Sequence, residues 1–314
     1  MRNHLLRAAA GAAASSGGGG GSSIINTDLY IHYDFSDINC WSRQSGTNTN
    51  DYTVHNLAND YNDGLLRSRT GNSVSFRNAS DSPNISFNSS DGGGCIEFTS
   101  QSSNSSGDQC GLVIPGSSSS TTNGASILYN ITTVSATDSN NVFNGIGTGP
   151  FTIESWFKLY LDHNETGFAW TGITKLVDNN GDNRYTGYRV FDAGYTTGSK
   201  GNKIEVHSGS ISDGVLVTPS GAPSSGAGWT NWNHLVYSRL DNTSDETKIY
   251  LNNSLINSVT NFYNYDYMSY FFLNFHGFGK PGIRQGIVRF YRGKALTASE
   301  VTTNWNAQKS RFGH

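Results

Sequence analysis

The sequence predicts an all-β fold, a β-sandwich or barrel that closes with one short helix. Charged residues make up only 14% of the 314 residues, whereas aromatic residues reach 12% and glycine occurs 37 times. Such a composition is typical of strands and turns. Short segments that alternate apolar and polar residues also recur between turn signals. No long stretch rich in Ala, Glu, Lys and Leu indicates a helix bundle.

The first predicted strand is DLYIHYDF, residues 28–35, because its apolar residues recur at every second position. Polar, turn-rich sequence then continues to about residue 65. Short candidate strands follow at 73–76 and 95–98, separated by loops rich in Gly and Ser. The stretches 101–108 and 117–122 are too polar for a core, and we expect surface loops there.

The second half of the chain predicts a denser series of strands. Asn252, Asn253 and Ser254 separate two apolar runs, which predicts a hairpin over residues 248–257. Many short strands at close intervals favour a sandwich or barrel. The expected strands cover residues 151–161, 173–177, 188–191, 203–206, 232–240, 248–251, 255–259 and 271–275.

The chain ends with a predicted strand, turn and helix. The strand is expected over residues 286–292, where Val288 and Phe290 share one face. The opposite face carries Ile287, Arg289 and Tyr291. This mixture of apolar and polar residues is typical of a partly exposed strand.

A capping box marks the start of the helix. Thr297 and Glu300 have the spacing at which each side chain satisfies a free amide of the first turn. Leu296 and Val301 occupy the positions of a hydrophobic staple, and Val301 shares a helical face with Trp305. So short a helix is stable only when this stripe packs on an apolar surface.

Residues 1–23 predict an N-terminal arm with a flexible linker, Gly17–Gly21, followed by one folded domain over residues 24–314. Arg7 interrupts the apolar run, so we do not expect a signal peptide, and no stretch approaches a membrane span. We expect the arm to anchor the protein through Arg2, His4, Leu5, Leu6 and Arg7.

Six segments, taken in order, resemble a known superfamily: DLYIHYDFSD (28–37), GGGCIEFTS (92–100), GPFTIESWFKL (149–159), WNHLVYSR (232–239), KIYLNNSLINS (248–258) and GIVRFYRGKALTASEVTTNWNAQKSRFG (286–313). They resemble the laminin-G-like, concanavalin A-like jelly rolls, especially the single-domain version in structural proteins of tailed marine and cyanobacterial bacteriophages. The resemblance covers nearly all of residues 24–313.

This resemblance implies a jelly-roll β-sandwich with a short C-terminal helix and an extended N-terminal arm. It implies that the last strand pairs beside the first and that the closing helix packs on the sandwich edge, with Val301 and Trp305 as its plug. Residues 311–313, Arg-Phe-Gly, resemble the tail of the phage members.

The sequence does not predict an enzyme. A glycosidase of this fold needs two carboxylates on one strand face, and Glu154 has no acidic partner two or four residues on. We therefore expect Glu154 to be a solvent-facing strand residue. Neither a nucleophile elbow nor a phosphate loop occurs. The net charge of −3 gives no electrostatic footprint for nucleic acid.

A Tyr-rich segment at 262–270 is the strongest candidate for binding. Exposed aromatic rings stack on sugars, and amide or carboxylate groups bind the hydroxyls. The same composition also suits protein interfaces or core packing, so these alternatives stay open. The carbohydrate or interface candidates are Tyr263, Tyr265, Asp266, Tyr267 and Tyr270, together with Trp170 and Trp229, whereas Trp156 and Trp232 are expected to be buried.

Calcium is the one cofactor that the sequence suggests. Residues 178–183, Asp-Asn-Asn-Gly-Asp-Asn, offer oxygen ligands through Asp178 and Asp182, although such residues are also common in hairpins.

The cysteines give no disulfide framework, because Cys40, Cys95 and Cys110 cannot all pair within one chain. A Cys95–Cys110 bridge and free buried thiols are both compatible with the sequence. The histidines are scattered without the spacing of metal ligands, so His207 and His234 are expected to be ordinary strand residues.

These observations predict a non-enzymatic phage virion structural protein, a capsid decoration or appendage subunit at the particle surface. The arm would bind other virion proteins, and a face of the domain would bind a host-surface glycan. The alternative is a tail-associated carbohydrate-binding module for host attachment. We expect a homo-oligomer, with neither nucleic acid nor membrane as a partner.

Overall fold

The computed structural model describes fifteen stretches of the chain, and the fold is given for these. They are residues 23–41, 53–58, 63–70, 73–75, 85–98, 109–115, 149–159, 168–175, 184–191, 203–210, 215–217, 229–240, 246–259, 270–273 and 283–314. The predicted arm and the predicted loops at 101–108 and 117–122 lie outside the described residues.

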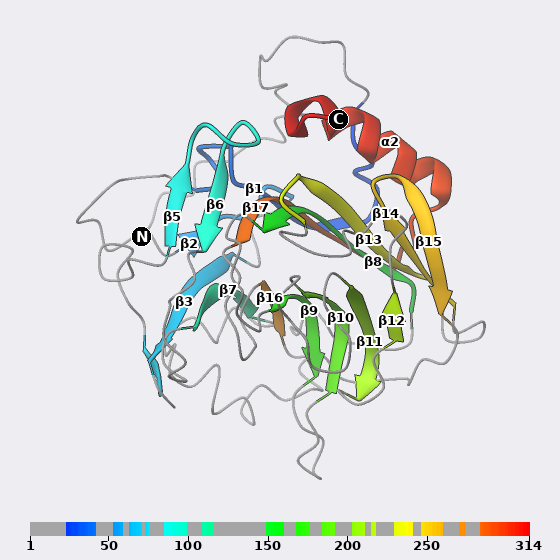
Figure 1. Ribbon diagram of the computed structural model, residues 1–314, viewed down its shortest axis with the longest axis horizontal. Coiled ribbons are helices and arrows are strands. Elements are labelled where there is room, and N and C mark those ends of the chain that lie inside the picture. Colours follow the sequence, from blue (N-terminus) through cyan, green and yellow to red (C-terminus); the bar gives the residue numbers. More distant parts are fainter. Residues whose placement is uncertain are drawn as a thin grey trace, which may run out of the picture.

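Two antiparallel sheets pack face to face, and one helix covers the outer face of the first (Figure 1). In the described part of the chain, sheet A has eight strands. Its order is β15 (Ser254–Val259), β14 (Thr247–Leu251), β13 (Asn233–Arg239), β8 (Phe151–Leu159), β17 (Ile283–Arg292), β6 (Cys95–Phe98) and β5 (Ile85–Asn88), with β1 (Leu29–Asp34) also paired to β17.

Sheet B has nine strands within the same described residues. Its order is β12 (Val215–Val217), β11 (Ile204–Ser210), β10 (Arg184–Phe191), β9 (Phe168–Lys175), β16 (Tyr270–Leu273), β7 (Gln109–Pro115), β3 (Gly64–Thr70) and β2 (Thr53–Val54), with β4 (Ser73–Ser75) paired to β3. The predicted jelly-roll sandwich with a C-terminal helix is thereby confirmed. Strands β2, β3, β5, β7 and β12 were not predicted from the sequence.

The first and last strands are neighbours, as predicted. β1 pairs antiparallel with β17, so that His32 lies opposite Arg289 and Asp34 opposite Ile287. The other edge of β17 pairs with β8 along its length. A bulge between Gln285 and Ile287 interrupts this ladder, and the Gln285 side chain donates to the carbonyls of Trp156 and Ile287 there.

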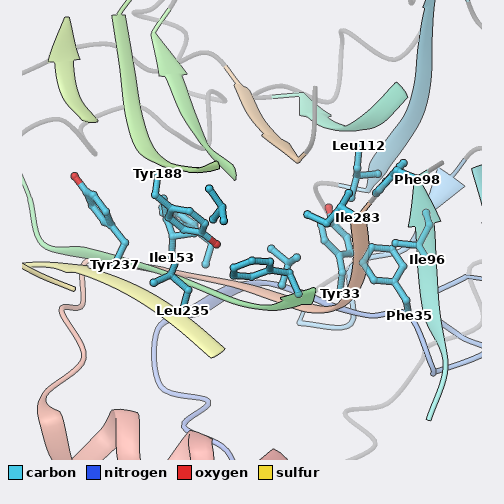
Figure 2. Close-up of a cluster of buried hydrophobic side chains, with 14 of the residues drawn as sticks. Tyr33, Phe35, Ile96, Phe98, Leu112, Ile153, Tyr188, Leu235, Tyr237 and Ile283 are labelled. Atoms are coloured by element: carbon cyan, nitrogen blue, oxygen red, sulfur yellow. The ribbon is translucent and has the colours of Figure 1, made fainter. Parts of the chain in front are cut away.

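The core lies between the sheets. Inward residues of β8 and β13, including Ile153, Leu235 and Tyr237, meet Tyr188 of β10 across the gap (Figure 2). The rings of Phe151 and Tyr237 stack with centroids 5.7 Å apart. One buried polar contact, between the Ser155 and Tyr188 hydroxyls, links the two sheets within this apolar layer.

The predicted hairpin forms between β14 and β15. Asn252 and Asn253 both have positive φ angles, 49° and 66°, as a two-residue turn of the primed type requires. The hairpin prediction is confirmed, and asparagine at both positions explains it, because this side chain tolerates the left-handed region better than most.

Helix α2 (Ala298–Gln308) begins with the predicted capping box. The Glu300 amide donates to Thr297 Oγ1 at 3.3 Å, and the Thr297 amide donates to Glu300 Oε2 at 2.9 Å. Leu296 and Val301 are buried together, which confirms the hydrophobic staple. A 3₁₀ turn (η5, Lys309–Phe312) continues the chain.

The helix lies over the middle of sheet A rather than at the sandwich edge, which corrects the expectation drawn from the resemblance (Figure 1). Val301 packs with Val236 of β13 and Tyr250 of β14, while Trp305 packs against Trp156 of β8. As a consequence, both faces of the central strands are buried. The outer face of β17, predicted to be partly exposed, has Arg289 and Tyr291 fully buried.

Candidate functional site

Glu154 is the main correction to the sequence-based expectations. It lies on the outer face of β8, but helix α2 covers that face, so the side chain is 0% exposed instead of facing solvent. A buried carboxylate is tolerated only when it is paired and hydrogen-bonded. Glu154 is surrounded by four polar side chains, and we call these five residues the Glu154 cluster: Glu154, His234, Arg289, Tyr291 and Asn304.

Each of the two carboxylate oxygens of Glu154 has two polar neighbours. Oε1 accepts from Arg289 Nη1 at 2.9 Å and lies 2.9 Å from His234 Nε2. Oε2 accepts from Asn304 Nδ2 at 2.7 Å, and the Tyr291 hydroxyl oxygen lies 3.4 Å from it. All five residues of the cluster are fully buried. The protein itself thus supplies partners to both carboxylate oxygens.

Electrostatics keep Glu154 ionised. Burial alone would raise its pKa, but Arg289 together with the contacts from His234 and Asn304 lowers the pKa to about 2. Burial, and then the charge of Glu154, raise the pKa of the Tyr291 hydroxyl far above its usual range. The cluster is therefore built around a permanent negative charge, not around a carboxyl group that exchanges protons near neutral pH.

The cluster also holds the root of the N-terminal segment. The Ile25 amide donates to Asn304 Oδ1 at 2.8 Å, and the Tyr291 hydroxyl donates to the Ile25 carbonyl at 3.0 Å. Ile25 and Leu29 also pack on the apolar residues under helix α2. The N-terminal and C-terminal parts of the domain consequently meet on one face of sheet A.

Aromatic rings extend the contact between the C-terminal segment and sheet A. Trp156 stacks on Phe312 and on Trp305, with ring centroids 4.3 Å and 5.1 Å apart, and His234 lies 4.8 Å away. Trp232 closes the end of this stack beside Phe312. The predicted burial of Trp156 and Trp232 is confirmed, as is the role of Val301 and Trp305 as a plug.

The Arg-Phe-Gly tail is held by its arginine. Arg311 Nη1 donates to both carboxylate oxygens of Asp34, at 2.9 and 2.7 Å. Its Nε and Nη2 donate to the carbonyls of Gly92 and Gly94 in the turn before β6. Burial would raise the pKa of Asp34, but Arg311 and Ser36 lower it overall. The tail motif thus fixes β1, the glycine turn and the C-terminus together.

A second polar group lies partly exposed at the β5–β6 end of sheet A. Asp91 accepts from Trp232 Nε1 at 2.8 Å and pairs with Lys158 and Arg284, while Arg284 Nε donates to Glu97 at 2.8 Å. The four charged side chains are 16–20% exposed. We call these residues, with Trp232, the Asp91 patch. The patch links the β5–β6 turn to β8 and β17. Its positive and negative side chains are both partly exposed to solvent.

The predicted binding residues are only partly described. Trp229 is 7% exposed and belongs to the core beside Phe157, so it is not the exposed stacking ring that we expected. Tyr270 and Trp170 lie in adjacent strands of sheet B, β16 and β9. The structure does not describe their side chains. Tyr263, Tyr265, Asp266 and Tyr267, the calcium candidates Asp178 and Asp182, and the anchoring residues Arg2, His4, Leu5, Leu6 and Arg7 lie outside the described residues.

Thiols and metal ligands add no reactive centre to the described residues. Cys40 and Cys95 are free and buried, so Cys95 is not bridged to Cys110. Burial raises the pKa of the Cys95 thiol to about 12, which makes it inert. Across the described stretches, no three His, Cys, Asp or Glu side chains gather as metal ligands would. In the same stretches, no helix has the length and apolar character needed to cross a membrane.

Sequence reasoning missed Asn304, Arg289 and Arg311 as organising residues. Asn304 follows Val301 by three positions and so shares the apolar face of α2, where a polar side chain requires a partner. The position of Asn304 on this apolar face was the one sequence feature that could have indicated a buried polar contact. The partners themselves could not be found, because Glu154 is 150 residues away in the chain.

Comparison with known proteins identifies the class of fold. No family model and no curated protein matches the sequence. Among solved structures, the chain is similar to Trypanosoma rangeli sialidase as its covalent intermediate with difluorosialic acid, with a TM-score of 0.53, 10% identity, and coverage of 93% of this chain and 34% of the sialidase.

Two neurotoxin structures are similar to the same extent. The binding domain of botulinum neurotoxin DC, in complex with rat synaptotagmin II, has a TM-score of 0.51 and 10% identity. Botulinum neurotoxin type C, whose cell entry depends on two ganglioside molecules, has a TM-score of 0.50 and 11% identity. Each match covers 90% of this chain and 52% of the toxin chain. The chain is therefore a β-sandwich that spans about a third to a half of these structures.

Proposed function

We propose that this chain is a non-enzymatic virion structural protein, a capsid decoration or appendage subunit anchored to the particle surface through residues 1–23. A face of its sandwich binds a host-surface glycan. The observation that carries the proposal is the double hydrogen bonding of Ile25 to Asn304 and Tyr291. Ile25 follows the proposed anchor in the chain, and its contacts with the Glu154 cluster support the proposal.

An anchor has to transmit force into the folded domain. Both hydrogen-bonding groups of Ile25 are engaged, and its side chain packs under helix α2. A pull on residues 1–23 would therefore act on the central strands β8 and β17 through Asn304 and Tyr291, rather than peel away an edge strand. The resemblance to phage structural proteins supports the same assignment, with other virion proteins as partners of the arm.

The chemistry of Glu154 supports a non-enzymatic role. A catalytic carboxylate of a glycosidase must reach the scissile bond and exchange a proton or form a covalent bond. Glu154 instead has both oxygens occupied by Arg289, His234, Asn304 and Tyr291, and its pKa is lowered to about 2. This carboxylate stabilises the attachment of the helix.

The second candidate function is a tail-associated carbohydrate-binding module for host attachment. The shared fold with a botulinum neurotoxin whose entry depends on gangliosides favours it. On this proposal the Tyr-rich segment 262–270 contacts the sugar, with Trp170 as a further stacking ring, and Asp178 and Asp182 bind a calcium ion on the rim.

Co-sedimentation tests the anchoring proposal. Purified virions that lack the native protein are mixed with the full-length chain or with a version lacking residues 1–23. We expect only the full-length chain to sediment with the particles. Sedimentation of both versions, or of neither, contradicts an anchoring arm. Light scattering of the same samples tests the expected homo-oligomer.

Binding to host-surface polysaccharide tests the glycan proposal independently. We expect the version lacking residues 1–23 to bind as well as the full chain, and Tyr265→Ala with Tyr267→Ala to lose binding. Asp91→Asn in the Asp91 patch serves as a matched surface control that retains binding. A chelator is expected to weaken binding if Asp178 and Asp182 hold calcium. The glycan proposal fails if no bacterial polysaccharide binds or shifts the unfolding temperature.

A further inference from the structure

The Glu154 cluster contains more polar nitrogen atoms than it has hydrogen-bond partners for them. Its acceptors are used, whereas several buried nitrogen atoms around it make no hydrogen bond within the described part of the chain. Buried polar atoms without a protein partner usually bind ordered water or an ion. These atoms are Nε and Nη2 of Arg289, Nε2 of His32, Nε1 of Trp156 and Nδ1 of His234.

Arg289 contributes the most specific part of this surplus. Its Nη1 atom donates to Glu154, which leaves Nε and Nη2 on the other side of the guanidinium group. The N–H bonds of these two atoms are parallel and match the spacing of two oxygens in an oxyanion. The residue is 0% exposed, so bulk water does not satisfy this edge.

Glu154 cannot serve this second edge. Its two oxygens are already in contact with Arg289, His234 and Asn304, and the Tyr291 hydroxyl lies beside Oε2. The ligand of the free edge therefore has to bring its own acceptor oxygens.

His32 stands beside this edge. It lies opposite Arg289 in the β1–β17 ladder, on the same outer face of sheet A. Side chains of directly opposite residues in an antiparallel pair are neighbours, with Cβ atoms about 4.5–5.5 Å apart. The buried Nε2 atom of His32 thus belongs to the residue directly opposite Arg289 and is a third polar group without a partner.

We propose that Arg289 and His32 form a buried site for one small oxyanion, which binds side-on to Nε and Nη2 of Arg289 and contacts Nε2 of His32. The occupant of the site completes the hydrogen bonding beneath helix α2 and so stabilises the closure of the sandwich by its C-terminal segment.

Charges of both signs surround the His32 ring. Burial lowers the pKa of His32 to about 3, and Arg289 is the largest charged contribution in the same direction. Arg311 adds to it, whereas Asp34 and Glu154 oppose it. The guanidinium group of Arg289 is thus the single charge that acts most strongly on the His32 ring.

Formate is a suitable probe, because it is a small planar carboxylate with two oxygens. The unfolding temperature of the full-length chain is measured in sodium formate and in sodium gluconate of equal ionic strength. Gluconate serves as the bulky carboxylate for comparison, and we expect it not to fit. We expect formate to raise the Tm in a saturable manner, by about 2–4 °C at roughly five times its Kd.

Two variants locate the effect. Arg289→Lys keeps a positive charge opposite Glu154 but has no side-on edge, so its Tm should not respond to formate. Arg292→Lys, at the end of the same strand and over the ring of Tyr30, is the matched control and should respond like the wild type. Equal Tm values of the wild type in both salts, or a wild-type response in Arg289→Lys, overturn the proposal.

A crystallographic measurement keeps the proposal testable even if Arg289→Lys does not fold. Wild-type crystals soaked in bromide should show an anomalous peak within hydrogen-bonding distance of Arg289 Nε and Nη2. His32→Leu should weaken this peak. Water density at the site with no anomalous signal shows that water satisfies the guanidinium edge, which also overturns the proposal.

Discussion

Asn304 donates a hydrogen bond of 2.7 Å to Glu154, and this contact joins the closing helix to the central strand β8. The oxygen atom of the same side chain accepts a hydrogen bond from the backbone amide of Ile25. One side chain therefore connects the helix, a buried carboxylate and the start of the domain. Because the charge of Glu154 is buried, the contact is worth more than a surface hydrogen bond.

Replacing Asn304 by alanine should destabilise the domain by about 2–3 kcal/mol, because a hydrogen bond to a buried charge is lost and the Ile25 amide loses its acceptor. Urea unfolding measures the change as a lower midpoint at constant slope. Asn306, exposed on the same helix, is the matched control. Asn306→Ala should change stability by no more than about 0.5 kcal/mol. Equal effects of the two substitutions contradict the assigned role.

The acid stability of the protein should depend on Glu154. Its pKa falls from an ordinary value of 4.5 to about 2 in the folded state, so ionised Glu154 stabilises the fold at higher pH. This contribution is lost as the pH falls from about 4.5 towards 2, with a slope of up to about 1.4 kcal/mol per pH unit.

Glu154→Gln should remove this part of the acid sensitivity and should cost about 3–5 kcal/mol near neutral pH, because Arg289 then lacks its counter-charge. Chemical unfolding at a series of pH values measures both effects. Glu246→Gln is a surface control and should retain the wild-type profile. An unchanged acid slope in Glu154→Gln shows that the carboxylate is not held ionised by the cluster.

The Arg311 side chain should contribute more to stability than any other charge in the tail. Arg311→Ala removes the two-oxygen pairing with Asp34 and the bonds to two glycine carbonyls, at a cost of about 1–3 kcal/mol. Lys309→Ala, in the same 3₁₀ turn, should be close to neutral. A double-mutant cycle with Asp34→Asn measures the coupling, expected to exceed about 0.5 kcal/mol. Additive effects would mean that the two side chains do not interact.

Gly92 and Gly293 provide a matched pair for the close packing under the tail. Both have positive φ angles, 57° and 76°. A Cβ atom at Gly92 would lie 2.7 Å from the Trp232 ring, whereas one at Gly293 would meet nothing within 4 Å. Gly293→Ala should therefore cost about 1–2 kcal/mol from backbone strain alone. Gly92→Ala should cost about 1–3 kcal/mol more, because it overpacks the site. Thermal or urea unfolding compares the two, and equal costs contradict the packing described for Trp232 and Phe312.

Local features of the fold were predictable because their causes lie within a few residues. The alternation in residues 28–35 predicted β1, the Asn252–Asn253 pair predicted the hairpin, and Thr297 with Glu300 predicted the helix start. The resemblance added the pairing of β1 with β17, which no local pattern could supply. Strands such as β7 were missed because a strand is recognised by its partners as much as by its own residues.

The candidate site was less predictable for a physical reason. Alternation along β8 and β17 shows which residues share a face but not whether that face is covered. Helix α2 covers it, so Glu154 and Arg289, both expected at the surface, form a buried ion pair. Trp229 was misjudged in the same way, because only the packed core shows that its ring is enclosed.

The sequence by itself determined the class of fold, the positions of most strands, the hairpin turn and the capped helix, because propensity, alternation and capping act over short distances along the chain. Only the tertiary structure decided that helix α2 lies on the middle of sheet A. It also decided that Asn304 forms hydrogen bonds with Glu154 and Ile25, and that Arg311 forms an ion pair with Asp34. These contacts join residues 150 to 279 positions apart. Their partners become apparent only once packing has buried the polar groups that need them.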